Sequence, residues 1–156
     1  HSRFPETTSL HAGARNMSEA PARIDRARIE EILRIAPFHA WLDLKVRSLT
    51  PQRLELEMPW RDEIVSNPII GSAHGGVLAS LIDLTGFYAL IAQGTKVKAT
   101  ADLRVDYHRP ATSGPLVATG LIVKVGQQIS VAETSVTGPN EKLLASGRGA
   151  YICGDL

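Results

Sequence analysis

The sequence predicts an α+β fold in which an antiparallel sheet of five to six strands wraps around one long central helix. Two observations carry this prediction: a long apolar stretch at 77–92 with helical character, and a change of hydrophobic period from 3.6 to 2 directly after it. Because the helix is apolar on all sides, it needs cover on nearly every face. A curled antiparallel sheet is the simplest cover.

The segments before the long helix predict a short helix and a hairpin. Apolar residues recur at helical spacing across 25–35, and Pro37 ends that pattern. Two segments of alternating polarity, 42–49 and 54–58, flank the turn-forming residues 50–53. We therefore expect a short leading helix followed by a β-hairpin.

The long helix begins at Gly75 or Gly76, after a loop at 60–71, and Gly94 stops it. The next segment, 97–107, alternates strictly between apolar and polar residues, as a half-buried strand does. This alternation predicts one buried face made of Val97, Ala99, Ala101, Leu103, Val105 and Tyr107.

Three further strands complete the predicted sheet, at 116–125, 128–137 and 142–152. The glycine-containing segments 126–127 and 138–140 separate them. Such spacing is typical of an antiparallel meander.

The length of 156 residues and the hydrophobic content of 44% suit one domain with one core, which we assign to residues 17–156. We expect residues 1–16 to be a tag or cloning remnant. They contain no apolar stretch like that of a signal peptide, and Met17 resembles a natural start.

Charge and cysteine usage argue against several classes of function. The chain has 17 basic and 16 acidic residues without a basic stripe, so we expect no nucleic-acid partner. Cys153 is the only cysteine, which excludes an internal disulfide and favours a reducing, cytoplasmic location. Polar residues and glycine interrupt the apolar run at 77–92, which is shorter than the about 18 residues of a membrane span, so we expect no membrane association.

Asp83 is the first candidate for chemistry, because it is the only side chain between Val77 and Ala92 that is charged at neutral pH. An unpaired charge in apolar surroundings costs several kcal/mol, roughly, so its presence suggests a functional role. Small residues at 79, 80 and 86 leave space near this carboxylate.

The start of the same helix is the second candidate. Backbone N–H groups at a helix N-terminus lack intrahelical partners and carry the positive end of the helix dipole. Gly75 and Gly76 can therefore receive an oxyanion, and neither has a side chain to block its approach.

The spacing of these two candidates predicts an assembly. Gly75 and Asp83 are eight residues apart, which is about 12 Å along a helix that rises about 1.5 Å per residue. One small reacting group cannot meet both. A second, antiparallel copy of the helix across a two-fold axis would bring its Asp83 to the first chain's Gly75, so we expect a homodimer at least.

The residues Asn67…His74-Gly75-Gly76…Asp83 resemble the H-G-G-x6-D signature of the PaaI-like (phenylacetate-pathway-type) acyl-CoA thioesterases, which have the hotdog fold. The segment 99–111 is similar to that family's next strand and the Arg-Pro-Ala turn after it. The resemblance covers roughly residues 41–153. It implies hydrolysis of an acyl-CoA to free acid and coenzyme A by a homo-oligomer, either a dimer or a dimer of dimers.

The resemblance also implies roles for individual residues. Asp83 would be the nucleophile or the general base, and the Gly75 N–H would polarise the thioester carbonyl. Asn67 would position the carbonyl or the attacking water, and His74 would support that site. Thr100 would hydrogen-bond the water or the carboxylate.

Substrate contacts are expected from Gly76, from Phe87 as an apolar wall, and from Arg104 and Arg109 as candidate partners of the coenzyme A phosphates. Lys124 and Arg148 are further cationic candidates. We expect no metal and no cofactor beyond the coenzyme A that is part of the substrate.

Each of these residues also has a purely structural interpretation. Asp83 could cap a neighbouring backbone, His74 could be part of the helix cap, and Asn67 before Pro68 is a common turn pair. Thr100 has the usual strand preference of a β-branched residue. His39 and His108, which lack ligand-like partners, are interpreted as surface or interface residues.

Two other functions remain open. A hotdog acyl-thioester dehydratase would need a catalytic histidine and an acid at a different spacing, and the nine residues from His74 to Asp83 argue against it. A non-catalytic acyl-CoA-binding or sensing protein would keep the pocket without hydrolysis, and the presence of Asp83 disfavours it.

Overall fold

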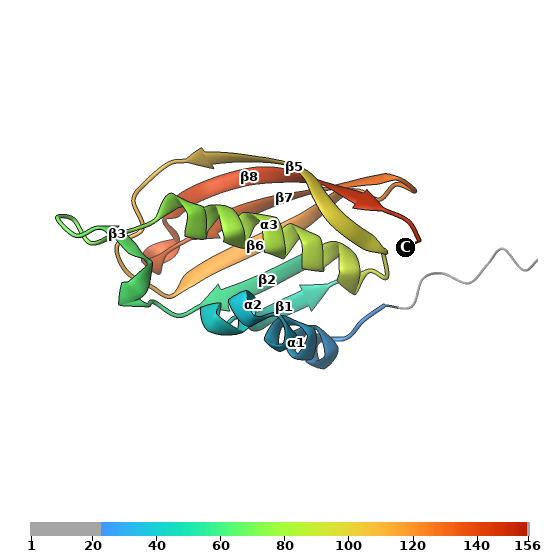
Figure 1. Ribbon diagram of the computed structural model, residues 1–156, viewed down its shortest axis with the longest axis horizontal. Helices are drawn as coiled ribbons and strands as arrows, with labels where there is room; N and C mark the ends of the chain where they lie inside the picture. Colours follow the sequence, from blue (N-terminus) through green and yellow to red (C-terminus); the bar gives the residue numbers. More distant parts are fainter. Residues whose placement is uncertain (1–22, 156) are drawn as a thin grey trace, which may run out of the picture.

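The computed structural model describes residues 23–155, so the predicted remnant at 1–16 lies outside the described residues. The described chain begins with two short helices, continues with a hairpin and a long helix, and ends with four strands (Figure 1). In chain order the main elements are α1 (Arg26–Ile35), α2 (Pro37–Leu42), β1 (Lys45–Thr50), β2 (Arg53–Met58), β3 (Val65–Asn67), β4 (Ser72–Ala73), α3 (Gly75–Ala92), β5 (Val97–Tyr107), β6 (Leu116–Lys124), β7 (Ile129–Thr137) and β8 (Leu143–Cys153).

One antiparallel sheet of six strands, in the order β1-β2-β6-β7-β8-β5, forms the body of the molecule. The helix α3 lies lengthwise on one face of this sheet (Figure 1). This is the hotdog arrangement, and it confirms the predicted α+β class, the six strands, the meander β6-β7-β8 and the long helix. Because β5 pairs with β8, it lies at the edge of the sheet rather than beside β6.

The core lies between α3 and the sheet. Leu81 and Ile82 of α3 are each 1% exposed, and they pack with fully buried residues of β2 and β6 such as Leu56 and Leu116. Burying a side chain of this size stabilises the fold by about 1.5–3 kcal/mol. The tight contact of α3 with the sheet therefore fixes the position of every residue along the helix.

By length and apolar composition alone, α3 could cross a membrane. However, the helix packs against the sheet, and 56% of its residues are buried in this fold. This burial is that of the core helix of a globular domain.

The leading helix is confirmed, with Asp25 as its N-cap: the Asp25 side chain accepts a hydrogen bond of 2.9 Å from the Arg28 N–H. The interpretation of Pro37 as only a helix end is incomplete, because Pro37 is also the first residue of α2. Proline suits this position, since its fixed φ is helical and its missing N–H would have had no partner there. The strand predicted to start at residue 42 consequently starts at Lys45.

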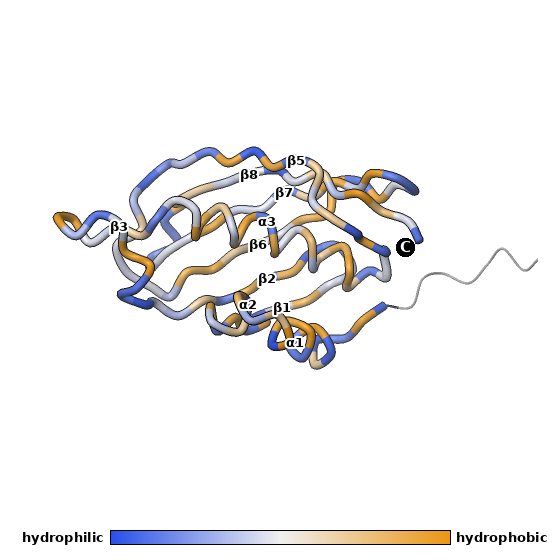
Figure 2. The backbone as a smooth tube through the Cα atoms, in the orientation of Figure 1, coloured by the Kyte–Doolittle hydropathy of each residue, from blue (hydrophilic) through white to orange (hydrophobic). Residues whose placement is uncertain are grey.

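The segment predicted as a loop at 60–71 contains a short 3₁₀ turn (Asp62–Ile64) and the small hairpin β3–β4. The hairpin projects from one end of the molecule, and its tip is hydrophobic (Figure 2). Ile69 is 91% exposed there and Ile70 is 54% exposed.

The strict alternation predicted for β5 is wrong, because two bulges interrupt its pairing with β8, between Val97 and Ala99 and between Thr100 and Asp102. Each bulge adds a residue to one strand and shifts the phase of the alternation. As a result Ala99 and Ala101 are exposed, whereas Thr100, predicted to face outward, is half-buried.

Tyr107 also departs from the predicted buried face and is 55% exposed.

Candidate active site

The N-terminus of α3 is capped by His74. The His74 Nδ1 atom accepts a hydrogen bond of 2.7 Å from the Gly76 N–H, and the His74 carbonyl accepts one of 2.9 Å from the Val77 N–H. The His74 N–H in turn donates to the Ile64 carbonyl at 2.7 Å. His74 is therefore part of the helix cap, as its structural interpretation predicted.

Because of this cap, the N–H groups of Gly75 and Gly76 differ in whether they can donate a hydrogen bond to a substrate. The Gly76 N–H is already bound to His74, so it is not free to receive an oxyanion as predicted. The Gly75 N–H donates no hydrogen bond to any acceptor among residues 23–155. Within the described part of the chain, only Gly75 therefore retains an open donor at this helix end.

Tyr107, at the end of β5, lies over Gly75. Its hydroxyl donates a hydrogen bond of 2.7 Å to the Gly75 carbonyl. A Cβ atom at position 75 would meet two carbon atoms of the Tyr107 ring at 3.1 Å and the Tyr107 hydroxyl at 3.2 Å. Glycine at this position thus makes room for a tyrosine of the same chain as well as for a substrate.

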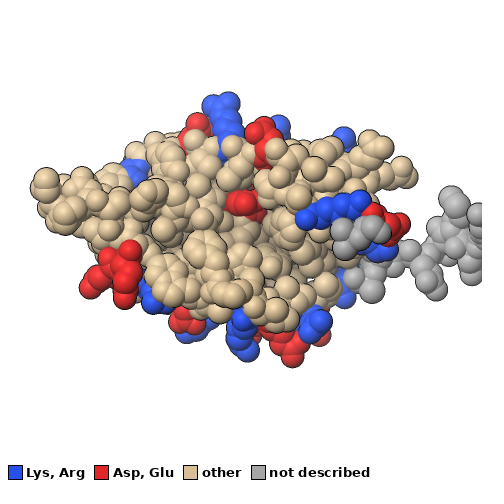
Figure 3. All heavy atoms as spheres, in the orientation of Figure 1, with Lys and Arg blue, Asp and Glu red and all other residues tan. Residues whose placement is uncertain are grey.

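Asp83 lies in the middle of α3, half-buried, on the side of the helix that faces away from the sheet. The Thr100 hydroxyl donates a hydrogen bond of 2.6 Å to its Oδ1 atom, so the predicted partnership of these two side chains is present. The face that carries α3 has few charged side chains, with an acidic group near its centre (Figure 3). The second carboxylate oxygen accepts no hydrogen bond from any described residue, which leaves it available to a water or a substrate.

Beneath Asp83, Tyr151 of β8 donates a hydrogen bond of 2.9 Å to the Asp83 main-chain carbonyl. Tyr151 is fully buried, and burial, reinforced by the negative charge of Asp83, raises the pKa of its phenol well above the ordinary value. A Cβ atom at Gly86 would lie 2.4 Å from the Tyr151 hydroxyl. The prediction that Gly86 leaves space for a substrate is therefore wrong, since its space is taken by Tyr151.

His39 of α2 was interpreted as a surface or interface residue, but it is half-buried beside α3. Its Nδ1 atom lies 3.3 Å from the Tyr88 hydroxyl, and the two rings meet edge to face with centroids 5.5 Å apart. Burial lowers the pKa of His39, and the charge of Asp83 opposes that shift, which places the imidazole within electrostatic reach of the carboxylate. The sequence held no signal for this contact, because α2 itself was not predicted.

Phe87 lies one helical turn after Asp83 and is half-buried, as an apolar wall of the site would be. Its ring packs edge to face on Tyr151, with centroids 5.9 Å apart, and contacts Tyr88 at 5.6 Å. The ring orientation of Phe87 is thus set by two tyrosines.

Asn67 is exposed at the end of β3, and its side chain accepts a hydrogen bond of 3.1 Å from the Ile69 N–H. This is the turn geometry of the structural interpretation. The single chain does not bring Asn67 to Asp83.

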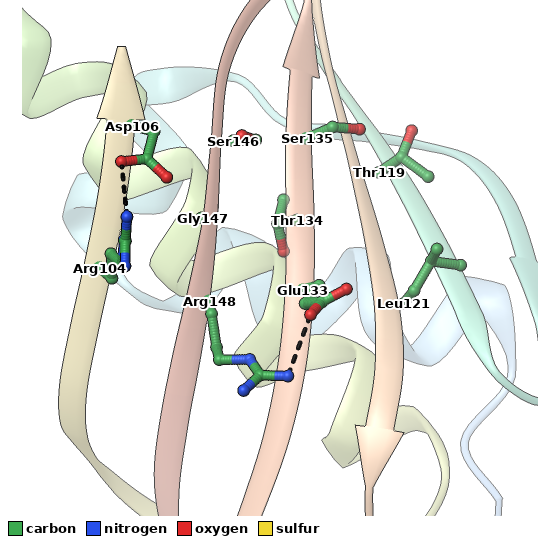
Figure 4. A pocket seen from close by; sticks show the side chains of 10 residues that line it. All are labelled: Arg104, Asp106, Thr119, Leu121, Glu133, Thr134, Ser135, Ser146, Gly147 and Arg148. Carbon is green, nitrogen blue, oxygen red and sulfur yellow. Dashed lines mark hydrogen bonds and ion pairs between the residues drawn. The ribbon is translucent and has the colours of Figure 1, made fainter.

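The two arginines predicted to bind substrate lie in different places. Arg104 forms an ion pair of 3.4 Å with Asp106 in a surface hollow of 480 Å³ on the sheet face away from α3 (Figure 4). Of the other cationic candidates, Arg148 lies in the same hollow, paired with Glu133 at 3.1 Å. Arg109 lies at the end of the sheet that also holds the start of α3, and its guanidinium donates to the Leu143 carbonyl at 3.0 Å.

Comparisons with known proteins agree with this geometry. Residues 70–145 match the model of the thioesterase superfamily. A solved member of that superfamily is 39% identical, covers 80% of this chain and 94% of its own, and superposes with a TM-score of 0.75. A protein of Halobacterium salinarum whose name describes it as an esterase is 33% identical over 123 residues, 72% of this chain and 81% of its own.

Two further matches bear on the predicted family. The PaaI protein of Escherichia coli, from the phenylacetic acid degradation operon, is 25% identical, with a TM-score of 0.69 over 81% of this chain and 94% of its own. The medium/long-chain acyl-CoA thioesterase YigI of Salmonella typhimurium is 25% identical over 135 residues, 76% of this chain and 86% of its own. The chain belongs to the thioesterase superfamily, in its PaaI-like hotdog form.

Proposed function

We propose that the protein hydrolyses an acyl-CoA thioester to a free acid and coenzyme A. The observation that carries the proposal is the Asp83–Thr100 pair on the open side of an otherwise apolar helix whose first N–H, at Gly75, has no partner in the described chain. A carboxylate and an oxyanion donor are the two groups that acyl transfer to water requires. The similarity to YigI supports coenzyme A as the thiol.

In the proposed reaction the thioester oxygen binds the Gly75 N–H, which stabilises the negative charge that develops on it. Asp83 then either removes a proton from the water that attacks the carbonyl, or attacks the carbonyl itself and forms a mixed anhydride, which water hydrolyses in a second step to the free acid and the restored carboxylate. The hydrogen bond from Thr100 orients the carboxylate in both cases. The thiolate of coenzyme A leaves and takes up a proton.

A hydrolysis panel with short, medium, long and aromatic acyl-CoAs tests this function, with release of free thiol as the readout. Asp83→Asn should lower turnover at least about a hundredfold, since general-base contributions are of that size, while the fold is kept. Near-normal turnover in folded Asp83→Asn would remove Asp83 from the mechanism. Binding of acyl-CoA without turnover by the natural sequence would instead identify an acyl-CoA-binding protein.

Each site is proposed to use two chains. The separation of about 12 Å between Gly75 and Asp83 along α3 is too long for one carbonyl group to meet both. The open side of α3 and the outer edge of β5, which has no neighbouring strand among the described residues, are both available to a second copy. An antiparallel pairing of the two α3 helices about a two-fold axis creates two equivalent sites.

Mixing two inactive variants tests the shared site. Asp83→Asn and Gly75→Val subunits should restore activity together, because both lesions fall in one site of the mixed dimer and leave the other site intact. With random exchange about half the dimers are mixed, so about a quarter of the sites should work. No recovery, with exchange confirmed by native mass spectrometry, would place the whole site in one chain.

For the coenzyme A phosphates, Arg109 is the better supported candidate. It lines a hollow of 360 Å³ together with Lys142, and no acidic residue lines that hollow. Neither cation forms an ion pair within the described part of the chain. The Ala73 N–H bonds to the Ala111 carbonyl at 2.8 Å, which joins this end of the sheet to the start of α3.

Arg109→Ala and Arg104→Ala form a matched pair for this part of the proposal. Loss of a charge-assisted phosphate contact should raise the KM for acyl-CoA about tenfold in Arg109→Ala. The KM for the matching acyl-N-acetylcysteamine, which has the same thioester and no phosphate, should not change. Arg104→Ala should behave like the natural sequence with both substrates, and an equal effect of the two substitutions would contradict the assignment.

A further inference from the structure

The start of α3 contains two consecutive glycines, the most flexible residues available, at the place where the proposed reaction needs a fixed donor. Fixing the backbone of one residue costs about 1–2 kcal/mol in conformational entropy. A helix end made of His74-Gly75-Gly76 therefore needs additional contacts to hold one geometry.

The contacts that residues 23–155 make at this helix end leave one polar group without a partner. In the His74–Gly75 peptide, the carbonyl accepts from the Val77 N–H at 2.9 Å, and the Gly75 N–H at the other end is open. In the next peptide, Gly75–Gly76, the carbonyl accepts from the Tyr107 hydroxyl and the N–H donates to His74 Nδ1, both at 2.7 Å. Since a peptide unit is planar, two bonds at opposite ends fix the orientation of its plane.

Tyr107 is well placed to hold this peptide. It is the last residue of β5, and the chain directly after it is anchored because the His108 and Arg109 N–H groups both donate to the Leu144 carbonyl. The side chain is 55% exposed, so burial explains little of its position. Two parts of the side chain contact Gly75. The hydroxyl donates to the Gly75 carbonyl, and the ring lies over the position that a side chain at residue 75 would occupy.

We infer that Tyr107 is a positioning residue which, together with His74, orients the Gly75–Gly76 peptide. This peptide shares the Gly75 Cα with the His74–Gly75 peptide, so fixing both planes limits rotation at Gly75 and holds the Gly75 N–H ready for the thioester oxygen. This inference rests on the proposed function and adds to it a residue 32 positions away in the sequence. An oxyanion donor lowers the barrier only when it is already oriented toward the charge that develops. Loss of the Tyr107 hydroxyl should thus affect the chemical step more than substrate binding.

Tyr107→Phe keeps the ring over Gly75 and removes only the hydroxyl. It should lower kcat about tenfold, the size expected for one lost neutral hydrogen bond, with KM within about twofold of the natural value. His74→Ala should have a similar effect, whereas His74→Asn, which keeps a side-chain acceptor at the N-cap, should retain most of the activity. The double variant Tyr107→Phe/His74→Ala should fall less than the product of the single effects, because both act on one peptide.

A second measurement does not depend on turnover. Amide hydrogen exchange at Gly76, followed by NMR, should be faster in Tyr107→Phe than in the natural sequence, while exchange in the middle of α3 is unchanged. An increase in KM at constant kcat, or unchanged kinetics together with unchanged Gly76 exchange, would overturn the inference. If the natural sequence hydrolyses no acyl-CoA, the proposed reaction fails, and the exchange result still decides whether Tyr107 holds the peptide.

Discussion

Two tyrosines donate hydrogen bonds to main-chain carbonyls of α3, one at each of the two residues that the proposed reaction uses. Tyr107 binds the Gly75 carbonyl at 2.7 Å from the end of the edge strand, and Tyr151 binds the Asp83 carbonyl at 2.9 Å from inside the sheet. The bonds are alike in chemistry, but Tyr107 is 55% exposed and Tyr151 is fully buried.

The difference in burial indicates which of the two tyrosines stabilises the fold. The buried ring of Tyr151 fills the space between α3 and the sheet and packs on Phe87, so its removal would leave a cavity. The exposed ring of Tyr107 fills no cavity, and its contribution lies in the geometry of one peptide. We therefore expect Tyr151 to govern stability and Tyr107 to govern turnover.

The sharpest contrast should come from alanine substitutions. Tyr151→Ala should reduce the free energy of unfolding by about 3–5 kcal/mol, as other large buried aromatic residues do. Tyr107→Ala should reduce it by less than about 1 kcal/mol, because its ring is largely exposed in the single chain and fills no cavity of the core. Urea unfolding followed by circular dichroism measures both, and similar losses in the two variants would contradict the comparison.

A pair of glycine substitutions extends the contrast between the core and the helix start: Gly149 lies against the Tyr151 ring, and Gly76 lies against the His74 ring. A Cβ atom at Gly149 would lie 2.2 Å from the Tyr151 hydroxyl, deep in the core, so Gly149→Ala should cost about 1–3 kcal/mol. A Cβ atom at Gly76 would meet only the His74 ring, at 2.8 Å, which can move into solvent. The stability of Gly76→Ala should accordingly stay within about 1 kcal/mol of the natural value. Thermal melts measure both variants, and a larger loss of stability in Gly76→Ala than in Gly149→Ala would contradict the prediction.

The raised pKa of Tyr151 predicts a loss of stability at alkaline pH. The unfolded tyrosine ionises above its ordinary pKa of about 10, while the folded one stays protonated, so the unfolded state binds fewer protons and stability falls as pH rises. The slope from this group approaches about 1.4 kcal/mol per pH unit above about pH 10. Tyr151→Phe should lack this contribution. Urea unfolding between about pH 8 and 11 should therefore show a shallower decline of its free energy of unfolding than in the natural sequence. Parallel declines in the two proteins would contradict the assignment of this pH dependence to Tyr151.

The smallest effect concerns a third hydroxyl, that of Thr85. Thr85 Oγ1 is buried and, among the described residues, forms no hydrogen bond, unlike either tyrosine. Replacing it by the similarly shaped valine removes an unsatisfied polar group, so Thr85→Val should be neutral or up to about 1 kcal/mol more stable. The urea midpoint measures the change in stability. A lower midpoint in Thr85→Val than in the natural sequence would indicate that the hydroxyl does have a hydrogen-bond partner.

Local sequence patterns were sufficient for the long helix, for the six strands of the main sheet and for choosing Gly75 and Asp83 as candidates, but not for α2, β3 and β4. Asp83 was identifiable because it is the only residue of an apolar helix that is charged at neutral pH. Gly75 was identifiable because the neighbouring residues mark the start of that helix. Both are local features of the sequence, which depend on the hydrophobic period of the helix and on the residues at its N-terminus. Thr100 was named for its partnership with Asp83, but strict alternation placed it on the wrong face, since bulges depend on the pairing with β8.

The sequence by itself determined the α+β class and the position of α3, and it made Gly75 and Asp83 the candidates for the proposed chemistry, because each of these follows from residues close together in the chain. Only the tertiary structure decided that His74 takes the Gly76 N–H, and that Tyr107 and Tyr151 hold α3 at those two residues across separations of 32 and 68 residues. Such contacts depend on how the sheet curls against the helix. That curvature comes from the packing of the whole core, and no local run of residues encodes it.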